Sequence, residues 1–540
     1  MNRKSEAKWV PKLFHQSLIS MNSTEIQEID QVEAKIGTEE ASPVSKDEVP
    51  LSTGSLIFHE PGINCCIIAI MGYKSKLDPA VIKEGLKQTL IKHPCFSSKL
   101  LSAIDQMMNS GKKKWIRTQV NVDNHVILPE VDTVTESPSQ FIEDYVTYLT
   151  GIPIDLSKPL WELHLVNLKT PEAEAVGIFR IHHSIGDGMS LISLLLACCR
   201  KSSDPKALPT LPKQKQADSR YPHPHGFFRL FLAIWSVLRL ILNTLVDLLL
   251  FVATVVFLKD TKTPLKGSSG VEQNAKKIVH RTVSLDDIKL VKDAMGMTVN
   301  DVILGVTEAG LSRYLNRKYG EVDRGKEAEQ KSNHLPRNIR LRATALVNIR
   351  QTAGIQVSFL SPFSRASEKV EYASQSFLVF KSKVKWGNQI GYICIPFTIA
   401  LRNDPLDYLR GAKAAGDRKK LSLEAICTHL TNKCVVKLFG SKLSAALVYR
   451  VIFNTTMTLS NVVGPVEEIS LYGHPIAFIA PSVYGHPQAL TCHFQSYMNK
   501  MSIVLAVDPN VIPDPRLLCD DLEESLKIFK DAVVLAKDAD

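Results

Sequence analysis

The chain has 540 residues, of which 45% are hydrophobic, so it can bury one large core or two medium ones. Its 65 Lys and Arg residues outnumber its 55 Asp and Glu residues, and the resulting charge of +10 suits anionic partners. The basic runs at 112–114 and 418–420 lack the interleaved aromatic residues that stack on bases, which argues against nucleic-acid binding.

The ten Cys residues form neither a CxxC pair nor a zinc-type spacing with histidine. The doublets at 65–66 and 198–199 lie in apolar runs, which indicates reduced core residues. Residues 1–20 lack the continuous apolar stretch of a secretory signal. We therefore expect most of the protein to be cytosolic.

Residues 1–48 are polar and cannot bury enough apolar surface to fold alone, so we expect a disordered extension. The next unit, residues 49–205, alternates strand-like and helical patterns, which predicts an α/β domain. Its strands are expected at 63–71, 160–168 and 175–181, and its helices at 78–92, 138–149 and 189–200.

Residues 206–277 combine two polar linkers with a strongly apolar stretch at 227–258. Within 240–258 only Asn243, Thr244, Asp247 and Thr254 are polar, and roughly 20 apolar residues suffice to span a bilayer. The stretch is therefore expected to span a membrane, to lie in the membrane interface, or to form a soluble crossover helix.

The last unit, residues 278–540, is predicted to be a second α/β domain, with Thr298 as the cap of one of its helices. Its strands are expected at 278–284, 343–349, 455–463 and 502–507, and its helices at 286–295, 299–315, 421–453 and 514–534.

The sequence HHSIGDG at residues 182–188 follows an apolar strand and precedes an apolar helix, where a loop can aim a side chain into a cleft. Histidine titrates near neutral pH, so it can accept the proton of a hydroxyl group whose oxygen attacks a thioester. Asp187 can lock the loop through an internal ion pair, which is a structural role and not a proton relay. Gly188 can supply a positive φ or a close backbone approach.

Two other interpretations of this loop remain. The histidine pair can be a hydrogen-bonded structural feature at the end of a strand. His182, His183 and Asp187 can also be metal ligands, although adjacent residues of a strand point to opposite faces and do not converge easily.

The loop matches the HHxxxDG motif of the CoA-dependent acyltransferase superfamily, which includes plant BAHD acyltransferases, carnitine acyltransferases and the condensation domains of peptide synthetases. Further strings narrow the resemblance: PLWE at 159–162, TVNDV at 298–302, VNIR at 347–350, WGN at 386–388, SNVVGP at 460–465 and GHP at 485–487. Together they resemble the plant bifunctional wax ester synthase/diacylglycerol acyltransferase family over most of the chain. Residues 357–383 are atypical of that family.

The resemblance implies an α/β fold of two chloramphenicol acetyltransferase-like subdomains around a central channel, plus one apolar membrane-associated helix. It makes His183 the general base, Asp187 the carboxylate that holds the loop, and His182 a neighbour of lesser consequence. Gly188 would allow the turn at the end of this loop. Asn300, Ser460 and Asn461 would lie near the channel, where an amide or hydroxyl group can support a developing oxyanion.

The implied activity is transfer of a long-chain fatty acyl group from acyl-CoA to a long-chain fatty alcohol, to diacylglycerol, or to both. Acyl-CoA is then a co-substrate, and neither a cofactor nor a metal is expected. The other partner is membrane lipid, at the endoplasmic reticulum or the plasma membrane, with the catalytic domain facing the cytosol. A soluble BAHD-like acyltransferase, a thioesterase and a catalytically idle lipid-binding homologue are the alternatives.

Overall fold

The fold is known from a computed structural model, which describes residues 48–100, 113–131, 137–211, 227–323, 333–350 and 386–538. The expected extension at 1–48, apart from Glu48, and the atypical segment at 357–383 lie outside these residues.

The first half of the chain contains the strands and helices that its sequence predicts, together with several short elements that were not predicted. In order they are β1 (Glu48–Pro50), α2 (Thr53–Leu56), β2 (Cys66–Tyr73), α3 (Pro79–Gln88), β3 (Ser98–Leu100), β4 (Lys114–Arg117), β5 (Val126–Ile127), α5 (Pro138–Gly151), β6 (Trp161–Val166), β7 (Ala175–His182), α6 (Gly188–Cys198), β8 (Cys199–Lys201) and α7 (Phe227–Val256). Helix α3 begins where Asp78 accepts the backbone N–H of Ala80 at 2.8 Å and Pro79 occupies the first turn.

The second half adds strands and most of the long helices. They are β9 (Lys277–Ser284), α8 (Leu285–Ala294), α9 (Val299–Asp323), β10 (Arg340–Asn348), β11 (Ile390–Thr398), α11 (Leu406–Lys420), α12 (Glu424–Phe439), α13 (Ser441–Asn454), β12 (Met457–Val462), β13 (Ile469–Leu471), β14 (His474–Tyr484), β15 (Leu490–Tyr497), β16 (Lys500–Val507) and α14 (Pro515–Asp538). Thr298 caps α9 as predicted, because its hydroxyl accepts the N–H of Asp301 while that carboxylate accepts the N–H of Thr298.

The prediction of a single helix over residues 421–453 is wrong. Gly440 separates α12 from α13 with φ 84° and ψ 169°, a conformation that is essentially confined to glycine. The apolar pattern continues across this residue, so periodicity alone does not reveal the break.

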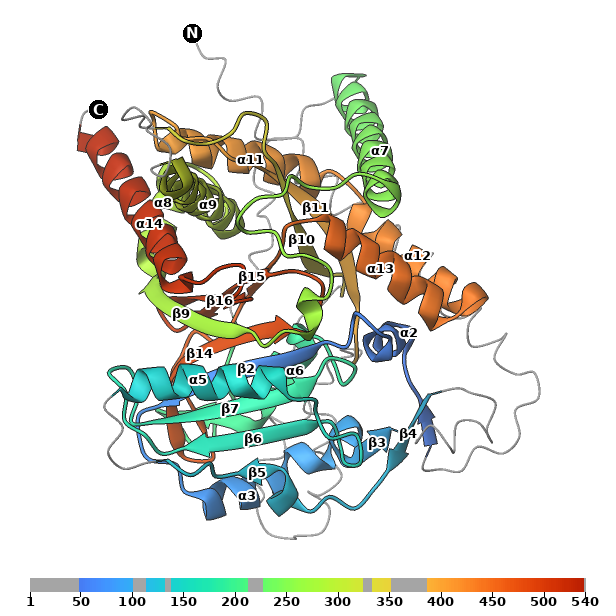
Figure 1. The fold of residues 1–540 in the computed structure, drawn as a ribbon, viewed down its shortest axis with the longest axis vertical. Helices are drawn as coiled ribbons and strands as arrows, with labels where there is room; N and C mark the ends of the chain where they lie inside the picture. Colours follow the sequence, from blue (N-terminus) through green and yellow to red (C-terminus); the bar gives the residue numbers. More distant parts are fainter. Residues whose placement is uncertain are drawn as a thin grey trace.

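Two large sheets form the two layers of the molecule (Figure 1). In the described part of the chain, the first sheet has the strand order β5-β6-β7-β2-β14-β13-β8 and the second has β11-β10-β12-β15-β16-β9. Strands β13 and β14 belong to the second half of the sequence but join the first sheet, where β14 pairs antiparallel with β2 from Ile476↔Tyr73 to Tyr484↔Cys66. Residues 469–484 therefore tie the two halves together.

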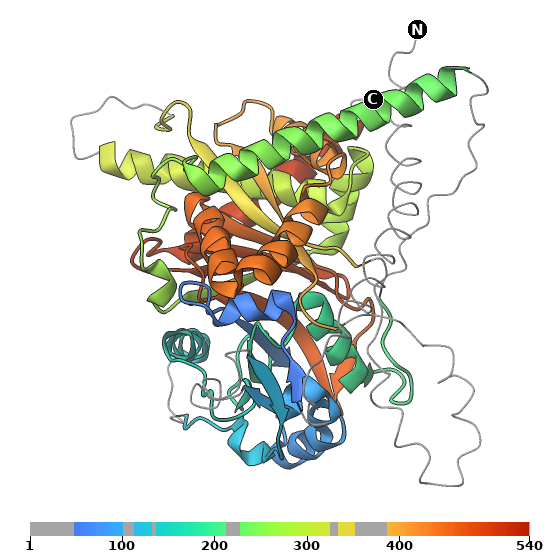
Figure 2. The same ribbon diagram turned by 90° about the vertical axis from the view of Figure 1, so that its right-hand side faces the viewer.

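Each sheet has its own hydrophobic core. The first core lies between the first sheet and helices α3, α5 and α6, and the second between the second sheet and helices α8, α9, α11 and α14. Helix α7 is different, because it lies along the outside of the second layer (Figure 2).

Candidate active site

The loop between β7 and α6 separates the two adjacent histidines, as strand geometry predicts. His182 is fully buried, and its Nδ1 lies 2.7 Å from the hydroxyl of Ser184 and also accepts the N–H of that residue. Its Nε2 donates to Oδ1 of Asn64 at 2.9 Å, and its ring stacks on that of His59. Both ring nitrogens of His182 are therefore used within the fold, and burial lowers its pKa well below the usual value.

His183 lies on the other face, beside an apolar cavity. Its Nδ1 is 3.2 Å from Oδ1 of Asn388, and the amide nitrogen of Asn388 donates to the backbone carbonyl of His183 at 3.0 Å and to the Ser55 hydroxyl at 3.2 Å. These two donations fix the orientation of the amide, so Oδ1 is an acceptor and Nδ1 carries the proton. The lone pair of Nε2 remains for a substrate. The ring stacks on Phe58 with centroids 4.2 Å apart.

The pKa of His183 is lowered, mainly because burial disfavours the charged ring, while the negative charge of Asp187 and the hydrogen bond to Asn388 act in the opposite direction. The ring is therefore a neutral base at pH 7. We expect kcat/KM to be flat through neutral pH and to fall only below the usual histidine pKa of about 6.5. Asn388→Ala should move this acidic limb to lower pH, because it removes the hydrogen bond that raises the pKa.

Rate measurements between about pH 5 and 8 test this expectation, with Asn388→Asp as the companion variant. A carboxylate at this position should stabilise the imidazolium ion and move the limb to higher pH. A wild-type limb above pH 6.5, or the same limb in all three proteins, would contradict the assignment of His183 as the titrating base.

Both carboxylate oxygens of Asp187 accept hydrogen bonds from residues around the loop. Its Oδ1 caps α6 by accepting the N–H of Ser190 at 3.0 Å, and its Oδ2 accepts Nη1 of Arg350 at 2.7 Å and the N–H of Gln389 at 3.0 Å. The ion pair with Arg350 is buried on both sides. None of these partners is His183, so Asp187 has the contacts of a group that holds the loop. The two histidines and Asp187 do not converge on one point as metal ligands would.

The prediction that Gly188 supplies a positive φ or a close backbone approach is wrong. Its φ lies outside the left-handed region, and a Cβ added there would meet only Cγ2 of Val462, at the ordinary contact distance of 3.7 Å. Gly188 is the first residue of α6 and lines the cavity, so a side chain at this position would occupy space beside His183 and not strain the turn.

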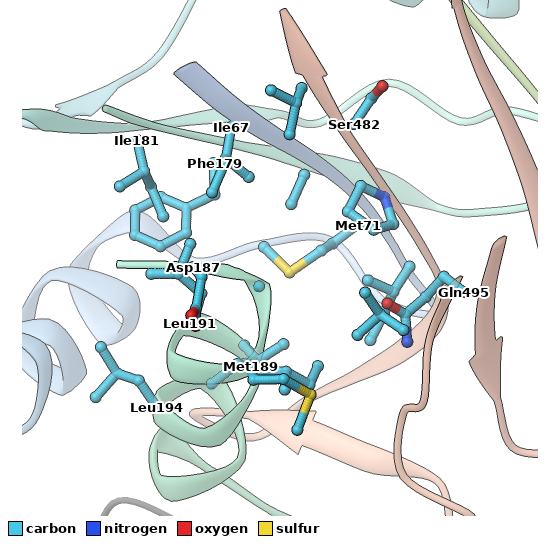
Figure 3. A pocket seen from close by; sticks show the side chains of 18 of the residues that line it. Ile67, Met71, Phe179, Ile181, Asp187, Met189, Leu191, Leu194, Ser482 and Gln495 are labelled. Carbon is cyan, nitrogen blue, oxygen red and sulfur yellow. The ribbon is translucent and has the colours of Figure 1, made fainter. Parts of the chain in front are cut away.

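The cavity beside His183 has a volume of about 220 Å³ and is mostly apolar. Figure 3 shows side chains of β2 (Ile67, Met71) and β7 (Phe179, Ile181) above the start of α6, which carries Met189 and Leu191. Residues of both sheets line the space, so it lies between the two halves of the protein.

The three polar residues expected near the channel occupy two different positions. Ser460 and Asn461 of β12 line the cavity together with His183. Asn300, in the first turn of α9, is exposed to solvent and does not line the cavity, but its side-chain oxygen accepts the amide of Asn461 at 2.6 Å. Asn300 therefore contacts the cavity only through Asn461.

Sequence reasoning assigned no role to Asn388, Arg350 or Phe58, which contact His183 or Asp187 directly. The first two lie in the strings WGN and VNIR, which carried the family resemblance without a function. Arg350 directly follows the strand predicted at 343–349, whereas no predicted element adjoins Asn388, so its string was the only signal for that residue. Nothing in the sequence indicates the stacking of Phe58.

The two-sheet fold is similar to that of a solved structure, the wax ester synthase/diacylglycerol acyltransferase from Marinobacter aquaeolei VT8, with a TM-score of 0.54 at 15% identity, covering 90% of this chain and 100% of that one. Family models described as the wax ester synthase/diacylglycerol acyltransferase catalytic domain and the WS/DGAT C-terminal domain match residues 74–303 and 386–530.

Two Arabidopsis thaliana proteins, wax ester synthase/diacylglycerol acyltransferases 5 and 11, are each 51% identical to the chain. Both alignments cover 90% of this chain, and they cover 94% and 96% of the respective relatives. The chain therefore belongs to the wax ester synthase/diacylglycerol acyltransferase family.

Proposed function

We propose that this protein transfers a long-chain fatty acyl group from acyl-CoA to a long-chain fatty alcohol, which gives a wax ester, or to diacylglycerol, which gives triacylglycerol. The names of its relatives support both products. The observation that carries the proposal is the neutral imidazole of His183, held by Asn388 at the side of an apolar cavity. Such a cavity accepts an aliphatic chain, and such a base accepts the proton of an alcohol.

The reaction follows from this geometry. Nε2 of His183 takes the hydroxyl proton while the alcohol oxygen attacks the thioester carbonyl, which forms a tetrahedral oxyanion. The intermediate collapses by breaking the carbon–sulfur bond, and the imidazolium ion returns its proton to the departing CoA sulfur. Nδ1 keeps its proton throughout, because Asn388 accepts its hydrogen bond.

We assign support of the oxyanion to Ser460 and Asn461, which line the same cavity. The contact of Asn300 with Asn461 would orient that amide. The function needs no cofactor or metal beyond acyl-CoA as co-substrate. The contacts of the loop also disfavour an idle lipid-binding homologue, because the base and the carboxylate that holds the loop are both in place.

The decisive assay offers the protein labelled palmitoyl-CoA with hexadecanol and with diacylglycerol in parallel, and separates the products by polarity. We expect a labelled ester from at least one of the two alcohols. Release of free palmitate alone would identify a thioesterase, and no turnover with either acceptor would refute the proposed function.

Helix α7 supplies the candidate membrane contact. Among the described residues, it is the one helix with a stretch long and apolar enough to cross a membrane, Ile234–Val256, with a mean hydropathy of 2.0. Its outer face exposes many large apolar side chains, including Leu242, Leu245, Leu249 and Val252, which recur at helical spacing. A soluble protein rarely exposes a continuous apolar surface of this kind.

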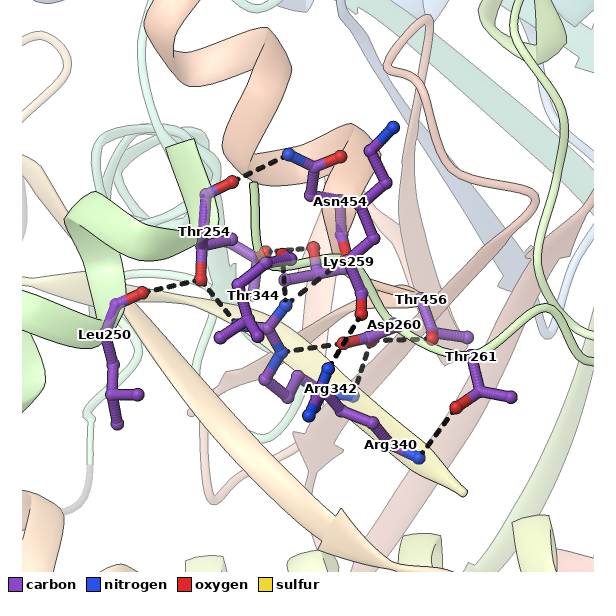
Figure 4. A network of polar contacts seen from close by, with 12 residues as sticks. Leu250, Thr254, Lys259, Asp260, Thr261, Arg340, Arg342, Thr344, Asn454 and Thr456 are labelled. Carbon is purple, nitrogen blue, oxygen red and sulfur yellow. Dashed lines mark hydrogen bonds and ion pairs between the residues drawn. The ribbon is translucent and has the colours of Figure 1, made fainter. Parts of the chain in front are cut away.

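Several polar side chains of α7 contact the rest of the protein. Asp247 is fully buried and pairs with Arg418 at 2.6 Å and Lys419 at 3.0 Å. Near the C-terminal end of α7, the Thr254 hydroxyl accepts a hydrogen bond from the Arg342 guanidinium group. Arg342 also forms an ion pair with Asp260 (Figure 4). Withdrawing α7 to span a bilayer would separate Asp247 from Arg418 and Lys419 and leave its carboxylate uncompensated, at a cost of about 3 to 5 kcal/mol.

We therefore propose that α7 lies in the membrane interface with its apolar face in the lipid, and that it does not span the bilayer. We place the protein at the endoplasmic reticulum, with the plasma membrane as the alternative and the catalytic domain in the cytosol. An interfacial helix would hold the cavity close to the membrane that dissolves both alcohols.

Replacing Leu242 and Leu249 together by Glu should release the protein from membranes. Each leucine contributes about 1.5 to 3 kcal/mol when fully buried, so the double variant should bind vesicles at least a hundredfold more weakly. The matched control is Leu535→Glu, because Leu535 is an equally exposed leucine on α14, away from α7. Vesicle co-sedimentation measures the difference. Equal binding of the double variant and the control would show that the membrane contact lies elsewhere.

A further inference from the structure

The floor of the apolar cavity is a regular ladder of side chains from three neighbouring strands. On β2, alternate residues face the cavity, and each lies beside a cavity residue of β14: Ile67 pairs with Val483, and Ala69 with Pro481. Ile67 and Ala69 also lie beside Ile181 and Phe179 of β7, and Met71 beside Ile479 completes the ladder.

This ladder is long enough for a fatty chain. His183 lies at its start, because its N–H donates to the carbonyl of Cys65 at 2.9 Å. From Cys65 to Met71 the strand advances by on the order of 20 Å at about 3.3 Å per residue. A lipid chain spans half of a hydrocarbon layer of about 30 Å, or roughly 15 Å. Helix α6 runs along the same space, and one side of it lines the cavity from Gly188 to Cys198.

Tyr472 stands at the far end of the ladder, in the turn between β13 and β14. Its ring packs against the backbone of Gly85, where an added Cβ would lie 2.4 Å from ring atoms. The hydroxyl of Thr89 donates to the carbonyl of Gly85 at 2.7 Å, so it accepts the hydroxyl of Tyr472, which lies 2.5 Å away. Tyr472 itself has a φ of +51°, which L residues rarely adopt. The ring is thus fixed by both its backbone and its hydroxyl group.

A second cavity lies on the other side of this ring. It has a volume of about 380 Å³ and is lined by Thr89, Arg200 and Ser470 among others. Tyr472 and Cys198 line both cavities, so they form part of the wall between them.

We propose that Tyr472 is a specificity-determining residue: its ring closes the far end of the cavity that begins at His183 and so sets the longest alkyl chain that the enzyme accepts. The inference rests on the proposed function, because it assigns the cavity to the alkyl chain of one substrate, the acyl group or the alcohol. Removing the ring joins the two cavities and makes room for a longer chain.

The test measures kcat/KM with two series of substrates. One varies the acyl-CoA from lauroyl through palmitoyl to lignoceroyl at fixed hexadecanol, and the other varies the alcohol from dodecanol to tetracosanol at fixed palmitoyl-CoA. Tyr472→Gly, which tolerates the positive φ, should raise the preference for the longest chain over the middle one by about tenfold in one series. Tyr472→Phe keeps the ring and should keep the wild-type preference.

A second variant tests the same cavity from the opposite direction and does not depend on the turn. Ala69→Leu adds bulk to the middle of the ladder and should shift the preference in the same series toward the shortest chain, again by about tenfold. The series that responds identifies which substrate's chain occupies the cavity. Unchanged chain preferences of both variants in both series would overturn the proposal. Ester formation by the wild type in the same assays tests the proposed function separately.

Discussion

His183→Ala is expected to reduce ester formation by about 10²- to 10⁴-fold, which is the usual loss when a general base is removed. The substitution removes an imidazole that lines the cavity and is oriented by a hydrogen bond to Asn388. The acyl-CoA would still bind, so the loss should appear in kcat more than in KM. Initial rates with palmitoyl-CoA and hexadecanol measure it.

The matched control is His182→Ala at the neighbouring position. His182 donates to Asn64 and accepts from Ser184, so its loss should lower the melting temperature. The folded fraction of this variant should nevertheless retain measurable turnover, because its ring does not line the cavity. Wild-type rates from His183→Ala would refute the mechanism, whereas total loss in folded His182→Ala would show that the roles of the two rings are not separate.

Arg350→Leu should destabilise the protein by about 3 to 5 kcal/mol, because it leaves the buried carboxylate of Asp187 without its charged partner. Turnover should fall with stability, since the same pair connects the histidine loop to β10. Urea unfolding gives the free energy change.

Adding Asp187→Asn to this variant should restore part of the lost stability, because the uncompensated charge is then gone. Asp187→Asn alone should lower both stability and turnover and should move the acidic limb of the kcat/KM profile to lower pH, because the negative charge of Asp187 raises the pKa of His183. A relay of protons through Asp187 would lower turnover in a protein of normal stability, and a fully stable Arg350→Leu would show that the ion pair does not hold the loop.

Local sequence patterns predicted the elements that depend on nearby residues. The strand before His182, the capped start of α9 at Thr298 and the long apolar helix α7 are all encoded within a few turns of chain. The separation of the two histidines also followed, because alternation along a strand is a local property.

The contacts that complete the site could not be predicted in this way. Asn388 meets His183 across about 200 residues, and β14 meets β2 across about 400, so their partners depend on how the two sheets assemble. An apolar strand pattern such as that of β14 indicates burial but not which sheet the strand joins. Whether α7 spans the membrane or lies in its interface was left open for the same reason. The partners of Asp247 lie on α11, which is far from α7 in the sequence although it contacts α7 in the fold.

The insertion of β14 beside β2 also sets the order of events during synthesis. Ribosomes add about 5 to 20 residues per second, so roughly 300 residues, or on the order of 15 to 60 s, separate the emergence of β7 from that of β14. Throughout this interval β2 has an unpaired, strongly apolar edge, the kind of edge that recruits other chains. The first half cannot complete its sheet alone, so we expect the nascent chain to need protection of this edge and the finished protein to unfold as a single cooperative unit.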